Sequence, residues 1–504
     1  MKRLASSATL VLGMVIALGA SAAKAEWKRA ETPRFIVYSD GDQGQLRDAA
    51  LQLELFESAM RMAHRMDPSG KPARRIAIYL VRDQAALKQV EPELRDGVAG
   101  FYQATDDDIF ALAIRERRDQ STLLHEYAHH FMMGSLTGGF PAWFVEGYAE
   151  YFANAEISSR RVVVGGVNRN SGEWLNYASW MPMNLLLTRR PFEFSDSNAV
   201  TSYYAQSWLL AHWFISDPDR LKMFYAYMAN LRQGQEPVAA MEAAVGMPIG
   251  RLERVQRDYL RQNFRVQVAT SDNFPRPDVQ IASLSPAESD LLLSGLRLSS
   301  TFGKDDALLA DIRRRAAAYP DDPFAILLLA RAELRLGDRA AARRLLSARL
   351  DEAPEDAVAL RLMGEAVWDD AKDNASDQLT LVREARGYLA KAYALEPDDY
   401  RTLYLLAETR QMSPDFPSDN DVETLLAALE LAPQSASLRL FTAQARAKRG
   451  EYDAAINLLQ PLASNPHSSG ATVLARGLIT RYQQAMVEKP SNEDATDDPA
   501  PSAG

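Results

Sequence analysis

Cysteine is absent from the 504 residues of the chain, and histidine is scarce, with six residues. Without cysteine the protein has no disulfide, no thiolate to act as metal ligand or nucleophile, and no cysteine that could carry a lipid. A positive excess of charge is also missing, because 57 basic residues face 67 acidic ones. We therefore do not expect nucleic acid or an anionic membrane surface as a partner.

Long apolar runs are missing beyond the N-terminus. The chain starts with the basic residues of MKR, continues with an apolar run from Leu10 to Ala20, and reaches the small-residue sequence AKA, which ends at Ala25. This three-part pattern predicts a secretory signal peptide over residues 1–25 and a periplasmic or secreted mature protein. An uncleaved membrane anchor is the alternative, but the run is shorter than a spanning helix requires. We expect no stable membrane anchor after cleavage.

Residues 26–269 alternate between strand-like and helix-like segments. Residues 34–38 and 75–81 are β-branched and aromatic, as in buried strands, and residues 45–66 between them have helical spacing. Residues 100–102 and 109–114 resemble a further strand pair around the turn-forming aspartates 106–108. A long helix is expected to follow. The pattern predicts an α+β domain.

Residues 270–300 begin with a proline-containing stretch and are predicted to be a linker. Beyond them, residues 301–482 are rich in alanine, leucine and arginine, and prolines recur at separations of 34, 43, 36 and 33 residues. These are Pro320, Pro354, Pro397, Pro433 and Pro466. A period near 34 predicts an all-α, tetratricopeptide-like solenoid of helix pairs, with a plain helical bundle as the alternative.

Two further features belong to this C-terminal part. The 43-residue unit contains an insertion, expected within residues 369–378, and the polar, acidic residues 483–504 are predicted to be a disordered tail. The solenoid is expected to bind a protein or peptide partner through its concave face.

Three of the six histidines lie in LLHEYAHHF, residues 123–131. His125 and His129 are four apart on a predicted helix, so both side chains project from one face and can hold one ion. Two imidazoles leave a tetrahedral Zn²⁺ in need of one more protein ligand and a water molecule. The adjacent Glu126 can accept a proton from that water. His130 points about 100° away and is predicted to be a neighbour of the site.

The sequence PAWFVEGYAEYF, residues 141–152, supplies carboxylates for such a site. Glu146 follows His129 by 17 residues, and Glu146 and Glu150 lie on one helical face. One carboxylate can bind the metal while the other accepts the free ring N–H of a ligand histidine. Zn²⁺ is the expected cofactor from the ligand types, which Mn²⁺ or Co²⁺ also accept.

The pairing of HEYAH with WFVEGYAEY resembles the gluzincin metallopeptidases, among them thermolysin and the aminopeptidase N family. It is most similar to the peptidase-MA-like families that carry P-x-W-x-x-E-G-x-A-E-Y. The resemblance implies a zincin-like fold for residues 26–269 with His125, His129 and Glu146 as zinc ligands. It also implies Glu126 as general base and Glu150 as the partner of a ligand histidine.

The sequence YYAQSWLL, residues 203–210, resembles the helix that carries the oxyanion-stabilising tyrosine of the aminopeptidase N family. The spacing to the following residues favours Tyr204 over Tyr203, and an ordinary half-buried aromatic residue is the alternative. The G-A-M-E-N segment of that family is missing, so amino-terminal trimming is not expected. Residues 108–114 stand in its place, either as a strand that pairs with an extended peptide or as a plain structural strand.

These patterns predict an exported zinc-dependent metallopeptidase, of endopeptidase type, whose repeats recruit a protein or peptide. The alternative is a catalytically inert, repeat-based scaffold or assembly protein with a structural metal site. The intact Glu126 favours the enzyme, because inactive relatives of an enzyme often lose the general base while they keep the ligands.

Overall fold

The computed structural model describes residues 26–115, 121–136, 138–158, 160–270, 274, 277–466 and 470–488. The predicted signal peptide, residues 1–25, therefore lies outside the described residues, as does most of the predicted tail. Residues 483–488 of that tail belong to the last helix. Within the described ranges, no helix combines the length and the apolar character needed to cross a membrane.

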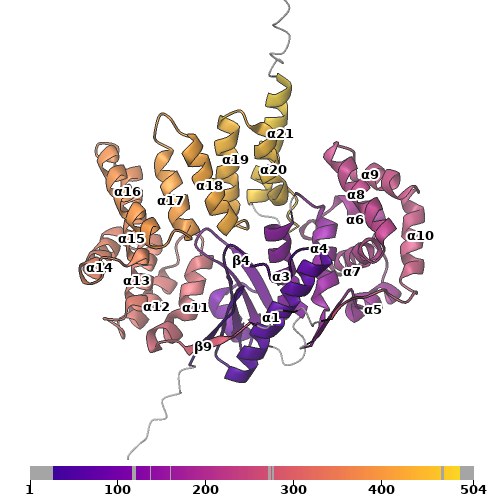
Figure 1. Ribbon diagram of the computed structural model, residues 1–504, viewed down its shortest axis with the longest axis horizontal. Helices are drawn as coiled ribbons and strands as arrows, with labels where there is room; N and C mark the ends of the chain where they lie inside the picture. The colour runs from indigo at the N-terminus through magenta and orange to yellow at the C-terminus, as the bar shows by residue number, and fades with distance from the viewer. Residues whose placement is uncertain are drawn as a thin grey trace, which may run out of the picture.

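A six-stranded mixed sheet forms the centre of the N-terminal part (Figure 1). Its strand order is β4-β5-β3-β2-β1-β9. The strands are β1 (Lys28–Glu31), β2 (Phe35–Ser39), β3 (Ile76–Val81), β4 (Gly100–Ala104), β5 (Ile109–Ile114) and β9 (Gln280–Ser283). β2, β3 and β5 are parallel, whereas β4, β1 and β9 pair antiparallel with their neighbours.

Helices cover both faces of this sheet. They are α1 (Gln43–Ala63) and α3 (Ser121–Ser135) on one face, and α2 (Gln84–Val90) and α11 (Pro286–Ser300) on the other. β3 shows the division, since Ile78 and Leu80 join the core under α1 and α3 while Tyr79 and Val81 join the core under α2 and α11. Parallel strands covered on both faces carry apolar side chains in succession, which explains the run IAIYLV.

A helical lobe follows α3 in the chain and lies beside the sheet (Figure 1). Its elements are α4 (Ala142–Ala153), α5 (Arg169–Tyr177), α6 (Met183–Thr188), the short 3₁₀ helix η1 (Pro191–Glu193), α7 (Ser197–Ile215), α8 (Pro218–Arg232), α9 (Pro237–Val245) and α10 (Ile249–Tyr259). A small antiparallel sheet also belongs to this lobe. Its strands are β6 (Glu156–Ser158), β7 (Arg161–Val164) and β8 (Gln267–Thr270). The prediction of an α+β part is confirmed.

The C-terminal part is a tetratricopeptide-like array of helix pairs. After α11 its helices are α12 (Asp306–Ala316), α13 (Pro323–Leu336), α14 (Arg339–Glu352), α15 (Ala357–Asp373), α16 (Gln378–Leu395), α17 (Tyr400–Arg410), α18 (Asp419–Leu431), α19 (Ala436–Lys448), α20 (Tyr452–Ala463) and α21 (Gly470–Glu488). Each of the five periodic prolines lies in the connection between one pair and the next. The prediction of helical repeats is confirmed.

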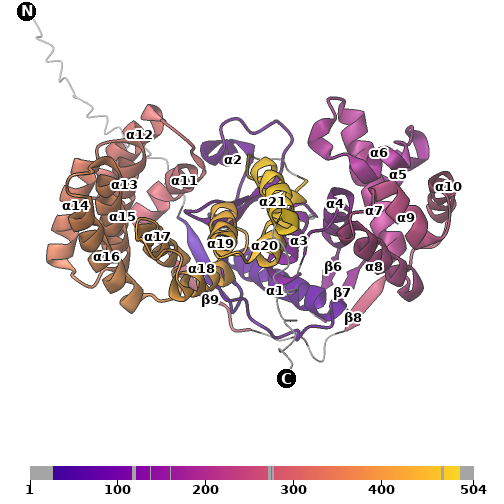
Figure 2. The same ribbon diagram turned by 90° about the horizontal axis from the view of Figure 1, so that it is seen from above.

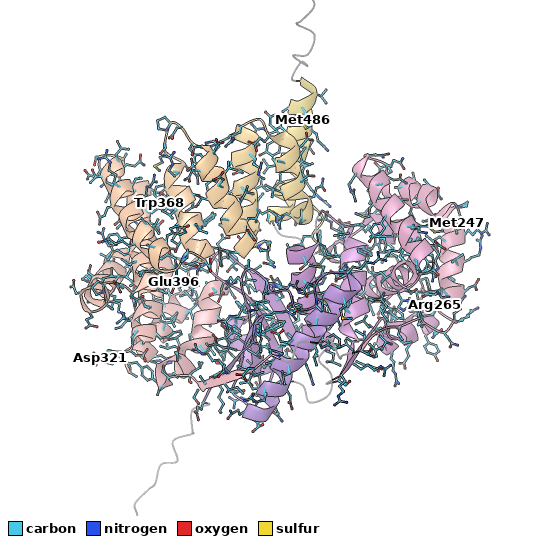
Figure 3. The ribbon with its side chains drawn as sticks, in the orientation of Figure 1. Met247, Arg265, Asp321, Trp368, Glu396 and Met486 are labelled. Atoms are coloured by element: carbon cyan, nitrogen blue, oxygen red, sulfur yellow. The ribbon has the colours of Figure 1, made fainter. Side chains whose placement is uncertain are left out.

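The long repeat unit departs from the expected loop insertion. α15 and α16 have 17 and 18 residues. Part of the predicted segment therefore extends the two helices, and residues 374–377 form the polar connection between them. Trp368 of α15, which Figure 3 labels, is buried against the facing helices. Of residues 369–378 only Ala371 is buried, so the added length is mostly polar surface.

The prediction of a linker over residues 270–300 was wrong. Residues 280–283 form β9, which pairs with β1 at the edge of the central sheet, and residues 286–300 form α11, which packs on that sheet. Ser285 caps α11 through a capping box with Glu288. Pairing between β9 and β1 joins segments about 250 positions apart, a contact that local composition does not reveal.

The helical array folds back over the N-terminal part, as the view from above shows (Figure 2). The tip of the β4–β5 hairpin is an anchor point, because the carboxylate of Asp107 forms ion pairs with Arg331 and Arg335 of α13. The adjacent Ile109 is buried in a cluster with residues of α17, α18 and α19. The array and the sheet therefore form one packed unit.

The expectation that residues 108–114 could pair with an extended peptide was also wrong. β5 lies between β3 and β4, and both neighbours occupy its backbone hydrogen-bonding groups. β5 is therefore a plain structural strand, which was the other reading of these residues. The outer strand at this side of the sheet is β4.

Candidate metal centre

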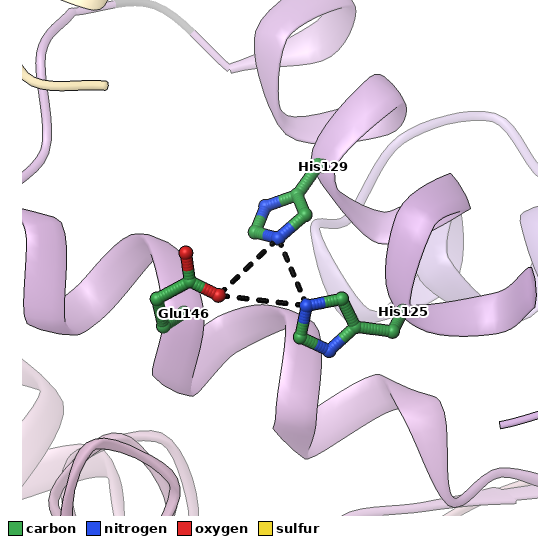
Figure 4. Close-up of side chains that lie close together, drawn as sticks. All are labelled: His125, His129 and Glu146. Atoms are coloured by element: carbon green, nitrogen blue, oxygen red, sulfur yellow. Dashed lines mark hydrogen bonds and ion pairs between the residues drawn. The ribbon is translucent and has the colours of Figure 1, made fainter. Parts of the chain in front are cut away.

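Three helices bring the predicted site residues together. α3 carries His125, Glu126 and His129, α4 carries Glu146 and Glu150, and α7 carries Tyr204. α4 packs against both of the other helices. Side chains spaced four apart on helices share a face, so the two histidines of α3 meet Glu146 of α4 (Figure 4).

His125, His129 and Glu146 form a compact cluster of donor atoms. The two Nε2 atoms are 3.1 Å apart, and each lies 3.4 Å from Oε2 of Glu146. Glu146 is fully buried, and His129 is 7% exposed. Burial of a carboxylate is costly unless positive charge or hydrogen bonds compensate it, so the cluster suits a cation.

The separations fit a small tetrahedral ion. Zinc binds histidine nitrogen and carboxylate oxygen at about 2.0–2.1 Å, and tetrahedral angles then place the ligand atoms roughly 3.3 Å from one another. The three separations of 3.1, 3.4 and 3.4 Å match this value. Two imidazole nitrogens and one carboxylate oxygen are also a common ligand set of catalytic zinc sites.

Glu150 orients His125. Its Oε1 atom lies 3.2 Å from Nδ1 of His125, on the side of the ring opposite the cluster. A proton on Nδ1 therefore has an acceptor, which leaves Nε2 as the ligand atom. Asn168 donates from Nδ2 to the other oxygen of Glu150 at 2.6 Å and so holds the carboxylate in place. Asn168 was not predicted, because it lies outside both motifs.

The same contacts favour a proton on His125 when no cation is bound. Burial lowers the pKa of His125, but hydrogen bonds and charges from Glu146 and Glu150 outweigh it and raise the pKa well above its ordinary value. Because a metal ligand must be the neutral imidazole, a cation that enters the cluster displaces this proton.

Gly147 allows α4 to approach α7 at the level of the cluster. A Cβ atom at this position would stand 2.8 Å from the Cβ of Ala211 and closer still to the carbonyl oxygen of Ser207. Trp143, one turn earlier, is fully buried among aromatic residues of α7 and α8. The glycine and the tryptophan of the W-x-x-E-G pattern thus set the depth at which Glu146 enters the site.

Tyr204 lies beside the cluster, with its ring centroid 6.3 Å from that of His125. Burial and the negative charges of Glu146 and Glu126 raise the pKa of Tyr204 well above its ordinary value, so the phenol keeps its proton. Tyr203 is fully buried and donates its hydroxyl to the carbonyl of Arg189 at 3.1 Å. Of the two tyrosines, Tyr204 is the one placed to contact a ligand in the site.

Glu126 and His129 form part of the wall of a cavity of about 420 Å³. Strand β4 and the end of the helical array supply other parts of this wall. The predicted general base and one of the three predicted ligand residues therefore border a space that can admit a ligand.

The remaining histidines have structural contacts. His130 shares a hydrogen bond with Tyr102 at 3.0 Å, and burial lowers its pKa to about 3. His64 bonds to the hydroxyl of Tyr148 at 2.8 Å. His212 is fully buried and bonds to the hydroxyl of Tyr259 and the carbonyl of Gly165. The sixth histidine, at position 467, lies outside the described residues.

Comparison with known proteins gives no family for the chain. No protein-family model matches it, and no curated protein does. Among solved structures it is similar to TTC0263, a thermophilic TPR protein of Thermus thermophilus, at 20% identity and a TM-score of 0.30 over 36% of this chain and 90% of that chain. It is also similar to the MamA RS-1 ArsTM double mutant, at 15% identity and a TM-score of 0.25 over 36% of this chain and 88% of that chain. Neither similarity bears on the chemistry of the candidate metal centre.

Proposed function

We propose that this protein is a zinc-dependent metallopeptidase of the gluzincin type that hydrolyses internal peptide bonds. The observation that carries the proposal is the donor cluster of His125, His129 and Glu146, whose separations suit tetrahedral zinc. The adjacent Glu126 faces a cavity, as a residue that contacts substrate must. We also propose that residues 1–25 are removed as a signal peptide and that the mature protein is periplasmic or secreted.

The side chains of His125, His129 and Glu146 would hold the ion, and His129 also lines the cavity. A zinc ion bound there supplies positive charge that lowers the pKa of water to near neutrality. Glu126 then accepts the proton of the attacking water and delivers it to the leaving amine. Tyr204, protonated because its pKa is raised, donates a hydrogen bond to the oxygen that becomes negative in the transition state.

Glu150 acts through His125. It accepts the Nδ1–H of His125 and so keeps the Nε2 lone pair directed at the centre of the cluster. Fixed orientation of the first ligands limits the reorganisation needed during the reaction. We therefore assign Glu150 and Asn168 as positioning residues of the proposed site.

Metal analysis of the purified protein tests the ligand set. We expect about one zinc per chain in the parent and almost none in His129→Ala. His64→Gln is a matched control, because His64 bonds to Tyr148 away from the cluster and its loss leaves the donor atoms in place. Equal zinc in the parent and His129→Ala would reject the site.

Cleavage of casein or of a mixed peptide pool tests the chemistry. Glu126→Gln should bind zinc but lose activity at least 10²-fold, since general-base catalysis contributes roughly 10²–10⁴-fold. Glu173→Gln, an exposed position on α5, should match the parent. Equal activity of the parent and Glu126→Gln would reject the general base. Absence of activity in the zinc-loaded parent would favour a structural metal in an inert scaffold.

A further inference from the structure

The cavity at Glu126 has two walls that lie far apart in the sequence. One wall comes from β4, α3, the loop that follows α3, and α4, and includes Met132, Met133 and Phe140. The other comes from the last helix pairs of the array and includes Ala436 and Leu462. A cavity of about 420 Å³ is large enough for a bulky side chain together with part of a peptide backbone.

The wall from the array is held against the N-terminal part by specific contacts. Gln434 donates from Nε2 to the carbonyl of His130 in α3 at 3.3 Å. Arg190, 5% exposed, donates from Nη2 to the carbonyl of Ala463 at 2.5 Å. These two bonds tie the end of the array to the N-terminal part, so the array residues that line the cavity are held in place.

The loop between α3 and α4 approaches the array closely. A Cβ atom at Gly139 would stand 2.6 Å from Oγ of Ser464 and 2.7 Å from the carbonyl oxygen of Gln460. A larger residue would push the loop and α20 apart. The glycine therefore permits the close approach that forms the second wall of the cavity.

We propose that this cavity accepts an apolar side chain of the substrate next to the scissile bond, and that the last repeats of the array thereby select the substrate. The inference rests on the proposed peptidase function. Glu126 and His129 lie in the same wall, so a group bound in the cavity is adjacent to the reacting carbonyl. The lining is mostly apolar, and a negatively charged side chain there would lose hydration and face the carboxylate of Glu126.

Two substitutions change the cavity from opposite walls. Ala436→Phe places a ring in it from the array, and Met133→Ala enlarges it from α3. Ala357→Phe is the matched control, because Ala357 is the first residue of α15 as Ala436 is the first residue of α19, with similar partial burial. Ala357 does not line the cavity. Thermal melting of each variant checks that it folds.

The first measurement is the cleavage of four blocked peptides. They differ only in the residue beside the cleavage site, which is phenylalanine, leucine, alanine or aspartate. The parent should prefer phenylalanine or leucine over alanine in kcat/KM. Ala436→Phe should reduce that ratio about tenfold or more, and Met133→Ala should shift the preference toward phenylalanine over leucine. Ala357→Phe should keep the ratios of the parent. Unchanged ratios in both cavity variants would overturn the inference while the peptidase proposal stands.

The second measurement does not depend on activity. Saturation-transfer NMR detects N-acetyl-phenylalaninamide bound to the full-length, metal-free protein and to zinc-loaded Glu126→Gln. We expect a ring signal with the parent and Ala357→Phe, and loss of most of it with Ala436→Phe. This pattern in a protein that cleaves no peptide would retain the apolar pocket and reject the peptidase proposal. No signal with the parent, or equal signals with Ala436→Phe and Ala357→Phe, would overturn the pocket.

Discussion

Replacement of Glu150 tests whether a carboxylate outside the proposed ligand set changes the zinc affinity of the proposed metal centre. Both carboxylate oxygens of Glu150 are engaged, one at 3.2 Å from Nδ1 of His125 and the other in a hydrogen bond of 2.6 Å from Asn168. The carboxylate is therefore held in one orientation and fixes the imidazole plane. Loss of such a partner typically lowers metal affinity about 10–100-fold.

The two simplest substitutions should differ in size of effect. In Glu150→Gln, the amide oxygen still accepts the Nδ1–H of His125 but carries no charge, so we expect zinc to bind about tenfold more weakly, a loss of ~1.4 kcal/mol. Glu150→Ala removes the acceptor, and we expect a loss of about 100-fold, ~2.8 kcal/mol.

The assay is titration of the metal-free, full-length protein with zinc in competition with a chromophoric chelator at pH 7.5. Glu173→Gln, which changes an exposed carboxylate of α5, should bind zinc as the parent does. Unaltered affinity in Glu150→Ala would refute the positioning role. Loss of zinc as complete as in His129→Ala would instead make Glu150 a ligand.

Further substitutions examine the packing, the chemistry and the pH dependence. Gly147→Ala should destabilise the protein by about 1–3 kcal/mol in urea denaturation, because its methyl group would overlap the carbonyl of Ser207. An unchanged midpoint would contradict the close packing of α4 on α7. Tyr204→Phe should lower kcat about 10²-fold with zinc content unchanged. Tyr203→Phe should keep the kcat of the parent but lose about 1 kcal/mol of stability, because its hydrogen bond is lost. The reverse pattern would exchange the roles of the two tyrosines. Burial lowers the pKa of His212 from 6.5 to about 4. Between these two pH values the unfolded chain binds a proton at His212 that the folded protein does not bind. The stability of the folded protein therefore falls as the pH decreases through this range. From pH 6.5 to 4 the parent should lose roughly 3 kcal/mol more than His212→Gln, and parallel curves for the two proteins would contradict this assignment.

The sequence was informative where the relevant geometry is local. His125 and His129 stand four apart on one helix, and Glu146 and Glu150 stand four apart on the next, so helical periodicity alone places each pair on one face. Regular prolines likewise marked the connections between helix pairs, because a helix pair and its turn form one local unit.

Features made by distant contacts could not be predicted in this way. The residues of β9 have no strong strand pattern, and they become a strand because β1 offers an open edge of the sheet. Asn168 has no recognisable spacing from Glu150, although it bonds to that carboxylate. Ala436 and Leu462 reach the cavity because the array curves back, a property of packing angles summed over many helices.

The docking of the array restricts where a recruited partner can bind. The array meets the N-terminal part through an ion-pair cluster at Asp107, an apolar cluster around Ile109 and a backbone contact at Ala463. Separation would expose the apolar cluster to water and break partly buried ion pairs, both of which cost free energy. The edge of the array that carries the loops before α17 and α19 is thus packed against the N-terminal part and is not free to bind another protein. Any partner protein recruited as the sequence predicts would have to use other surfaces of the array, and it would then act on an array that is one wall of the proposed substrate pocket.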